Sequence, residues 1–163
     1  MSAIFQAVKA PSIKGLVDAI ARNASEDALC KALTPKQWDV MAPYLQLFSL
    51  PPSQVLIPQG TLDRTVYFLE SGGLSVHFED YKGRVHLAIV NPGSAVGEAG
   101  FFSNMPRNAT VQSVGECRLW KLHYSKFLEL SQNQPSVALA LAMGLAATMT
   151  KRMVDRRKKV SIT

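Results

Sequence analysis

The chain has 163 residues, 47% of them hydrophobic, which suits one soluble domain with a sizeable core and leaves no room for a second full-sized domain. Its net charge of +6 comes from 18 Lys and Arg against 12 Asp and Glu, and six of the basic residues fall between Lys151 and Lys159. Cys30 and Cys117 are too few and too far apart for a disulfide framework or a cysteine-based metal site, and neither a signal peptide nor a membrane span is expected, which favours a cytoplasmic protein.

Residues 1–47 are expected to form helices. Ser25 resembles a helix start, and Thr34 with the proline that follows it is typical of another. Trp38 and Tyr44 suit an apolar core better than an aromatic binding site at this helical spacing. The first helix is predicted from apolar residues at helical spacing, namely Ile13, Leu16, Val17, Ile20 and Ala21.

From residue 48 to residue 125, short apolar runs separated by glycine turns predict strands. Short strands at even spacing favour a rolled antiparallel sheet over alternating βαβ units. The predicted strands are Val55–Ile57, Val66–Leu69, Leu74–Phe78, Val85–Val90, Thr110–Val114 and Cys117–Leu122.

Helical spacing returns over residues 126–160, where one long helix is predicted from Pro135 to about Lys159. The basic end of this helix is either solvated, with its charges complementing the helix dipole, or attracts an acidic protein, nucleic acid or anionic lipid. An apolar seam on the helix packs either on its own domain or on a second copy in a homodimer. The seam consists of Val137, Leu141, Leu145, Thr148 and Met149.

The most informative segment runs from Gly97 to Thr110, with the sequence GEAGFFSNMPRNAT. It resembles the phosphate-binding cassette of cyclic-nucleotide-binding domains, in which Gly-Glu, a short apolar helical turn and Pro-Arg-x-Ala-Thr or Ser follow in order. The glycine-marked turns upstream are similar to those of the family as well, so the resemblance covers roughly Trp38 to Val160. It implies an α+β, mainly β fold: an antiparallel β-roll (double-stranded β-helix or jelly roll) between N-terminal helices and a long C-terminal helix.

The resemblance also implies which residues bind a cyclic nucleotide, with no further cofactor. Arg107 would hold the phosphate oxygens through its planar fork of donors, and Glu98 would accept the ribose hydroxyl proton. A short helix from Ala99 to about Phe102 would aim free N–H groups at the anion, and its two phenylalanines would anchor the cassette to the roll. The alternative is that Glu98 and Arg107 pair with each other. The full ligand-binding set is Gly97, Glu98, Ala99, Arg107, Asn108, Ala109 and Thr110.

Asn108 leaves the base open, because its amide could donate to the phosphate or to guanine. The C-terminal helix resembles the dimer helix of catabolite-activator-type regulators, so Arg152 is expected to approach Glu98. Arg156 and Arg157 replace the small hydroxyl residues that contact adenine in that group. A base lid is expected from Met149, Arg152, Met153 and Arg156, and the equal alternative for Met149 and Met153 is that they are core residues.

The sequence thus predicts a sensor of cAMP or cGMP, with cAMP favoured, whose C-terminal helix changes position to regulate an unidentified effector protein. No catalytic set presents itself, and His77, His86 and His123 lack the spacing of a cupin metal site. A DNA-associated transcription regulator is one alternative. The chain stops at Thr163 with no helix-turn-helix, which argues against sequence-specific DNA reading if this is the whole protein. A nucleotide-independent docking or dimerisation module is the other.

Overall fold

A computed structural model describes residues 10–25, 28–29 and 33–160, with side chains to Asp155. Within these residues two four-stranded antiparallel sheets form a roll, with strand orders β1-β8-β3-β6 and β2-β7-β4-β5. The strands are β1 (Gln46–Leu50), β2 (Val55–Ile57), β3 (Thr65–Ser71), β4 (Leu74–Glu79), β5 (Val85–Val90), β6 (Ala95–Val96), β7 (Thr110–Ser113) and β8 (Cys117–His123). The expected antiparallel roll is confirmed.

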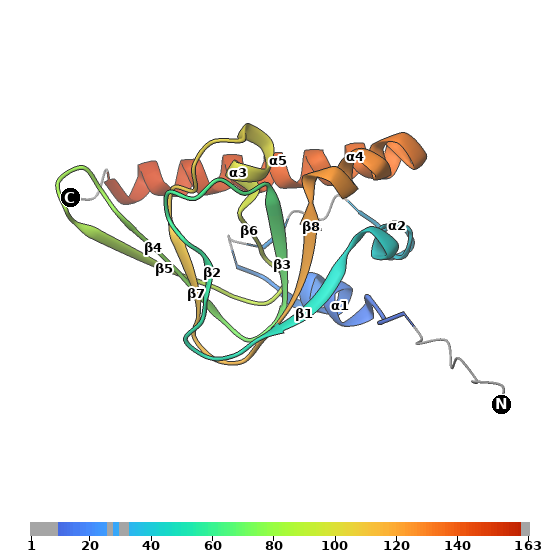
Figure 1. The fold of residues 1–163 in the computed structure, drawn as a ribbon, viewed down its shortest axis with the longest axis horizontal. Helices are drawn as coiled ribbons and strands as arrows, with labels where there is room; N and C mark the ends of the chain where they lie inside the picture. The colour runs from blue at the N-terminus through green and yellow to red at the C-terminus, as the bar shows by residue number, and fades with distance from the viewer. Residues whose placement is uncertain (1–9, 26–27, 30–32, 161–163) are drawn as a thin grey trace, which may run out of the picture.

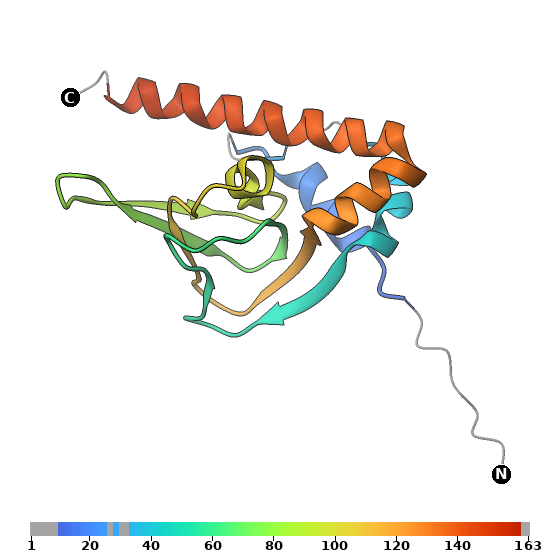
Figure 2. The same ribbon diagram turned by 45° about the horizontal axis from the view of Figure 1, so that its top comes forward.

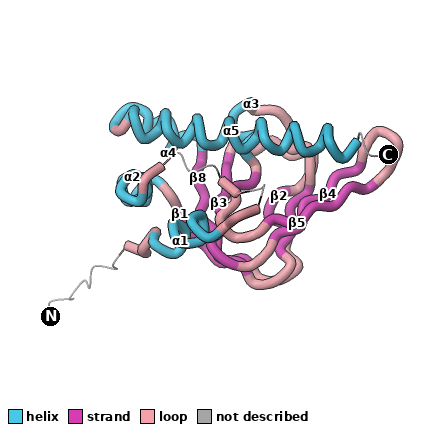
Figure 3. Tube along the Cα trace, turned by 180° about the vertical axis from the view of Figure 1, so that it is seen from behind, coloured by secondary structure: helices cyan, strands magenta, loops and turns pink. Residues whose placement is uncertain are grey.

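The helices lie around this roll (Figure 1). The long helix α5 runs across it, and α3 lies between α5 and the strands (Figure 2). Seen from behind, α1 and α2 lie at the end of the roll away from the β4–β5 hairpin (Figure 3). The helices are α1 (Lys14–Arg22), α2 (Pro35–Met41), the 3-10 turn η1 (Ala42–Tyr44), α3 (Glu98–Ser103), α4 (Tyr124–Asn133) and α5 (Pro135–Val160).

Local sequence explains why α2 begins where it does. Thr34 accepts a hydrogen bond from the Gln37 backbone N–H at 3.2 Å, and the Gln37 side chain accepts one from the Thr34 N–H at 2.9 Å. This capping box satisfies two N–H groups that a helix start leaves without partners. The predicted start at Thr34 is therefore confirmed. The start expected after Ser25 falls largely on residues 26–27 and 30–32, outside the described residues, as does Cys30.

The core has two parts. One lies between the helices and the β1-β8-β3-β6 sheet, where the Trp38 ring packs edge-on against Phe68 with ring centroids 5.5 Å apart. The other fills the inside of the roll around Leu69, Leu74 and Leu119. Trp38 is buried, which confirms that it belongs to the core.

All six predicted strands are present, but β1 and β6 were missed. The β1 strand starts at Gln46, inside the segment expected to be helical, and pairs residue by residue with β8. Its inward and outward positions do not alternate cleanly between apolar and polar residues, so it lacks the usual strand signal. The β6 strand has only two residues, too few for any periodicity.

The predicted seam of α5 packs on its own domain. Val137, Leu141, Leu145 and Thr148 are buried, whereas Leu139 and Met143 on the other side of the helix are more than 60% exposed. Of the two alternatives left open by the sequence, the intramolecular one is thus correct for this seam. Among the described helices, α5 is long and apolar enough over Pro135–Asp155 to cross a membrane. In the most apolar part of this stretch, 33% is buried in the fold.

Candidate functional site

The cassette is shaped by a glycine at its start. Gly97 has φ +86°, in the left-handed region, and caps the first turn of α3. A Cβ at this position would come within 2.7 Å of Arg107 Nη1 and 2.9 Å of the Thr65 carbonyl oxygen. Glycine is required there both for the backbone angle and for the close approach of the arginine.

Phe101 anchors the α3 helix to α4. Its ring is fully buried and packs edge-on against Tyr124 and Phe127 of α4, with centroids 5.6 and 5.4 Å apart. Phe102 is only half-buried. Phe101 therefore anchors the cassette to the first turn of α4, and it shares a core cluster with Val66 and Phe68 of the roll, to which the anchoring was expected.

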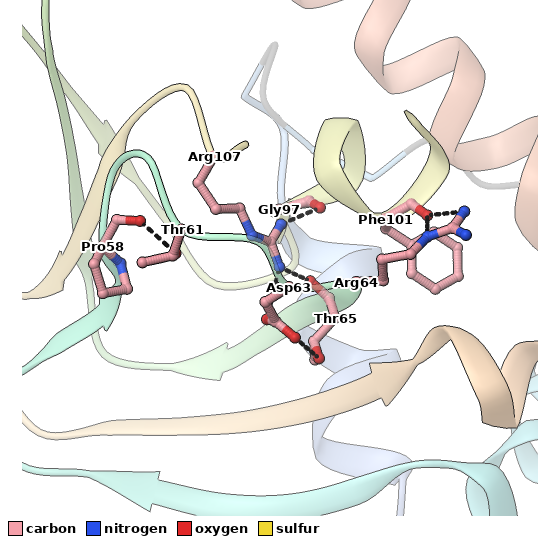
Figure 4. A network of polar contacts seen from close by, with 8 residues as sticks. All are labelled: Pro58, Thr61, Asp63, Arg64, Thr65, Gly97, Phe101 and Arg107. Carbon is pink, nitrogen blue, oxygen red and sulfur yellow. Dashed lines mark hydrogen bonds and ion pairs between the residues drawn. The ribbon is translucent and has the colours of Figure 1, made fainter. Parts of the chain in front are cut away.

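Arg107 is held inside the protein, with only 3% of its side chain exposed. Its Nη1 donates to the Gly97 carbonyl at 2.7 Å, and its Nη2 donates to the Thr65 carbonyl at 2.6 Å and to Asp63 Oδ2 at 2.9 Å (Figure 4). Its Nε–H is buried and has no hydrogen-bond partner among the residues that the structure describes. Because an unsatisfied buried donor is costly, this N–H is suited to an anion bound beside it.

The Arg107 backbone is fixed by the loop between β2 and β3. Its N–H donates to the Thr61 carbonyl at 2.8 Å, and its carbonyl accepts from the Gly60 N–H at 2.7 Å. Both ends of this arginine are thus positioned by the segment that runs from Gly60 to Thr65. A guanidinium held in this way needs little reorganisation to meet a ligand.

Glu98, the first residue of α3, is buried and forms an ion pair with Arg152 of α5 through Oε1. Arg152 also donates through Nη2 to the Ala95 carbonyl at 2.8 Å. Arg152 thus approaches Glu98, as the sequence led us to expect. The alternative pairing of Glu98 with Arg107 is wrong, because the ionic partner of Arg107 is Asp63.

The other predicted ligand-binding residues surround these two. Ala99 is half-buried on α3 and Ala109 is buried, while Asn108 is exposed. Thr110 begins β7, and its Oγ1 accepts from the Gln59 N–H at 3.0 Å. Of the predicted set, Gly97 contacts the Arg107 guanidinium directly, and Gly100 lies against the same side chain.

The predicted lid residues differ in their surroundings. Met149 is half-buried, Arg152 binds the cassette, and Met153 is 58% exposed. Because Met153 is largely in contact with solvent, it covers no part of the core here. The side chains of Arg156 and Arg157 lie outside the described residues.

Sequence reasoning missed Asp63 and Thr65, which hold the Arg107 side chain, and the Ala95 carbonyl that binds Arg152. Asp63 lies three residues after Gly60, which marks one of the glycine turns that resemble those of the family. An acidic residue so close to such a turn was the signal that could have pointed to Asp63. Yet 44 residues separate Asp63 from Arg107. A pairing over that distance depends on how two loops meet, which no local pattern reveals.

Tyr67 shares the electrostatic environment of this site. Burial raises the pKa of its hydroxyl above the ordinary value, and the charge of Asp63 raises this pKa further, while Arg107 opposes the increase. The residue stands on β3, two positions after Thr65. Its neutral form is thus favoured next to the buried arginine.

Two of the three histidines, His86 and His123, have structural contacts away from the cassette. His86 stacks on Phe78 with ring centroids 4.7 Å apart and lies 3.1 Å from Asp80 Oδ2. His123 caps α4, where its Nδ1 accepts from the Ser125 N–H at 3.2 Å. The part of the chain that the structure describes contains no group of three or more His, Cys, Asp or Glu residues suited to a metal ion.

Known proteins resemble this chain in sequence and in fold. The chain is 29% identical over 119 residues, 72% of its length and 55% of the relative's, to the cAMP-activated global transcriptional regulator CRP of Escherichia coli O6:H1. The chain therefore spans about half the length of that curated relative.

Two solved structures share the fold. A cyclic nucleotide-binding domain from Methylobacillus flagellatus superposes with a TM-score of 0.78 at 15% identity, covering 91% of this chain and 82% of the other. The regulatory domain of Toxoplasma gondii PKA, crystallised with cAMP, has a TM-score of 0.55 at 28% identity, covering 71% of this chain and 41% of the other.

The family comparison agrees with the geometry. The model of the cyclic nucleotide-binding domain matches residues 47–134, more than half of the chain, and this range includes the roll from the second residue of β1 onward and the complete cassette. The chain belongs to the cyclic nucleotide-binding domain family.

Proposed function

We propose that this protein is a sensor that binds a cyclic nucleotide, with the phosphate on Arg107 and a ribose hydroxyl on Glu98. The observation that carries the proposal is the buried Arg107 guanidinium, which lies against Gly97 and Gly100 and whose Nε–H finds no partner within the described part of the chain. A phosphate would satisfy that donor with a charge-assisted hydrogen bond. Glu98 uses Oε1 for Arg152, so its Oε2 serves the hydroxyl.

The favoured ligand is cAMP, with cGMP as the alternative. The support comes from relatives, since one is named a cAMP-activated regulator and another was crystallised with cAMP. Asn108, the position that leaves the base open, is exposed, so it can turn toward a ligand without losing a buried contact. Binding rather than catalysis is the proposed activity, in a cytoplasmic protein.

The C-terminal helix is the proposed output. Arg152 connects α5 to Glu98, so a ligand hydroxyl on Glu98 shares the carboxylate that holds the helix. A ligand shifts a helix only by binding one position of it more tightly than another. This shared carboxylate supplies such a difference, and the moved helix would regulate an effector protein.

A homodimer through α5 is part of the proposal. It uses a different face of the helix from the apolar seam predicted from the sequence. The buried seam is occupied by the domain's own core, which leaves the opposite side of the helix for a second copy. That side is apolar and rich in small residues, which lets two helices approach closely. It presents Leu139, Met143, Ala146 and Ala147, all exposed.

Calorimetric titration of the purified chain with cAMP and with cGMP tests the proposal. Arg107→Lys keeps the charge but loses the fork of donors, and should weaken binding by about 1.5–3 kcal/mol, the usual worth of a charged hydrogen bond. Arg84→Ala, which removes an exposed arginine on the distant hairpin, is the matched control and should bind like the wild type. A folded wild type that binds neither nucleotide would refute the proposal and leave a docking or dimerisation module.

The DNA-associated alternative has one observation in its favour, the basic residues between Lys151 and Lys159. Electrostatic binding to phosphates weakens steeply as salt rises, because counterions are released. A titration of duplex DNA at increasing salt distinguishes this alternative, which needs DNA binding with that salt dependence.

A further inference from the structure

Arg64 lies between the two residues that hold Arg107. Asp63 supplies a carboxylate to the Arg107 guanidinium and Thr65 supplies its carbonyl, at 2.9 and 2.6 Å. Peptide bonds join these three residues, so a shift of Asp63 or Thr65 moves the Arg64 backbone with it. A ligand that changes the contacts of Arg107 with Asp63 or Thr65 therefore also moves the Arg64 backbone.

The Arg64 side chain holds the far end of the cassette helix. Its Nε and Nη2 donate to the Phe101 carbonyl at 3.0 and 2.8 Å (Figure 4). Nη2 also donates to the Phe102 carbonyl at 3.0 Å. These carbonyls lie in the last turn of α3, where helical partners are lacking. In the part of the chain that the structure describes, the hydrogen bonds of the Arg64 guanidinium all run to α3, so the guanidinium fixes the position of that helix.

Arg64 also contacts the start of α4. Its Cζ lies 3.4 Å from the centroid of the Tyr124 ring, and its carbonyl accepts from the Tyr124 N–H at 2.9 Å. A guanidinium stacked on an aromatic face is attracted by the ring's electron density. Tyr124 in turn packs on Phe101, and α4 leads directly into α5.

We infer that Arg64 is the positioning residue that couples nucleotide binding at Arg107 to the position of α4 and α5. The inference rests on the proposed function and adds the route by which the site reaches its output. Arg64 contacts α3 and α4 at once, and its backbone neighbours contact Arg107. Removing its side chain frees α3 from the Asp63–Thr65 segment and removes the stacking contact with Tyr124. The backbone hydrogen bond to Tyr124 remains, and Asp63 and Thr65 still hold Arg107.

The test compares Arg64→Ala and Arg64→Lys with the wild type, and uses Arg84→Ala as the matched control for the loss of an arginine. Calorimetry gives the cAMP affinity, and hydrogen–deuterium exchange with and without saturating cAMP gives the response of α4 and α5. Arg64→Ala should keep its affinity within about threefold, which is less than a typical coupling factor of about 5–150-fold, yet lose most of the cAMP-dependent change in exchange. Arg64→Lys, which keeps the charge over Tyr124, should restore part of that change.

The outcomes separate the possibilities. A full cAMP-dependent change in Arg64→Ala overturns the inference, and so does an affinity loss in proportion to the loss of response, because that would make Arg64 a binding residue. If Arg64→Ala does not fold, Arg64→Lys and Tyr124→Leu decide by the same two readouts. A wild type that binds no nucleotide refutes the proposed function itself, whereas a wild type that binds without any change in α4 and α5 refutes only the coupling.

Discussion

Arg152 on α5 joins the C-terminal helix to the cassette, because its guanidinium pairs with Glu98 and donates to the Ala95 carbonyl. The two partners stand on either side of Gly97, Ala95 at the start of β6 and Glu98 at the start of α3. A single side chain therefore ties α5 to both elements that meet at the site. The Glu98–Arg152 ion pair therefore holds α5 on the cassette, and it uses the carboxylate that is proposed to bind the ribose hydroxyl.

Arg152→Ala should loosen the attachment of the C-terminal part of α5 to the cassette. It leaves the buried Glu98 carboxylate without its ionic partner, at a cost of about 1–3 kcal/mol in the free energy of unfolding. Urea denaturation measures this cost, and hydrogen exchange should show faster exchange of the α5 amides near residue 152. Lys151→Ala, at the exposed neighbouring position, is the control. Equal stability in the two variants would mean that the Glu98 pair contributes nothing.

Gly97→Ala should damage the site beyond its effect on the backbone. A non-glycine residue in the left-handed region costs about 1–2 kcal/mol, and here the added Cβ would also press on Arg107 Nη1 and the Thr65 carbonyl. Gly60→Ala separates the two effects, because Gly60 has φ +84° but open space where an added Cβ would lie. Denaturant unfolding and cAMP titration of both variants should show a larger loss for Gly97→Ala. Equal losses would show that the crowding of Arg107 is unimportant.

The sequence contained most of the fold but only part of the site. Glycine turns and apolar runs located six strands, and Thr34 located α2, because these signals act within a few residues. The resemblance of the cassette pointed to Glu98 and Arg107, and the helix match pointed to Arg152. The hold of Asp63 and Thr65 on Arg107 depends on the meeting of two loops far apart in the chain. Tertiary contacts of this kind leave no periodicity to read.

Leu141→Ala and Leu139→Ala should separate the two faces of α5. Leu141 is fully buried, so its truncation leaves a cavity and should lower the free energy of unfolding by about 2–5 kcal/mol. Leu139 is 64% exposed, so its truncation should change the stability of the monomer by less than about 0.5 kcal/mol. Analytical ultracentrifugation adds the second readout, since Leu139→Glu should dissociate a dimer formed through the exposed face. A dimer that survives this change must use another surface.

Asp80 should make the tip of the β4–β5 hairpin sensitive to acid. The hydrogen bond with His86, followed by those from the backbone N–H groups of Arg84 and Lys82, holds the pKa of the Asp80 carboxyl well below its usual range. A pKa that folding lowers contributes stability above the unfolded pKa of about 3.9, and this contribution is lost as the pH falls through the folded pKa.

Asp80→Asn removes the charge, so the variant should be less stable than the wild type at pH 7, and the difference should shrink only below about pH 4. Urea unfolding at pH 7, 5 and 3 measures the difference, and Asp39→Asn at an exposed position of α2 controls for the loss of one negative charge. A difference that already disappears between pH 7 and pH 5 would contradict the assignment, because the carboxylate is fully ionised throughout that range. The hairpin would then owe its shape to the Phe78–His86 stack rather than to the bonds that converge on Asp80.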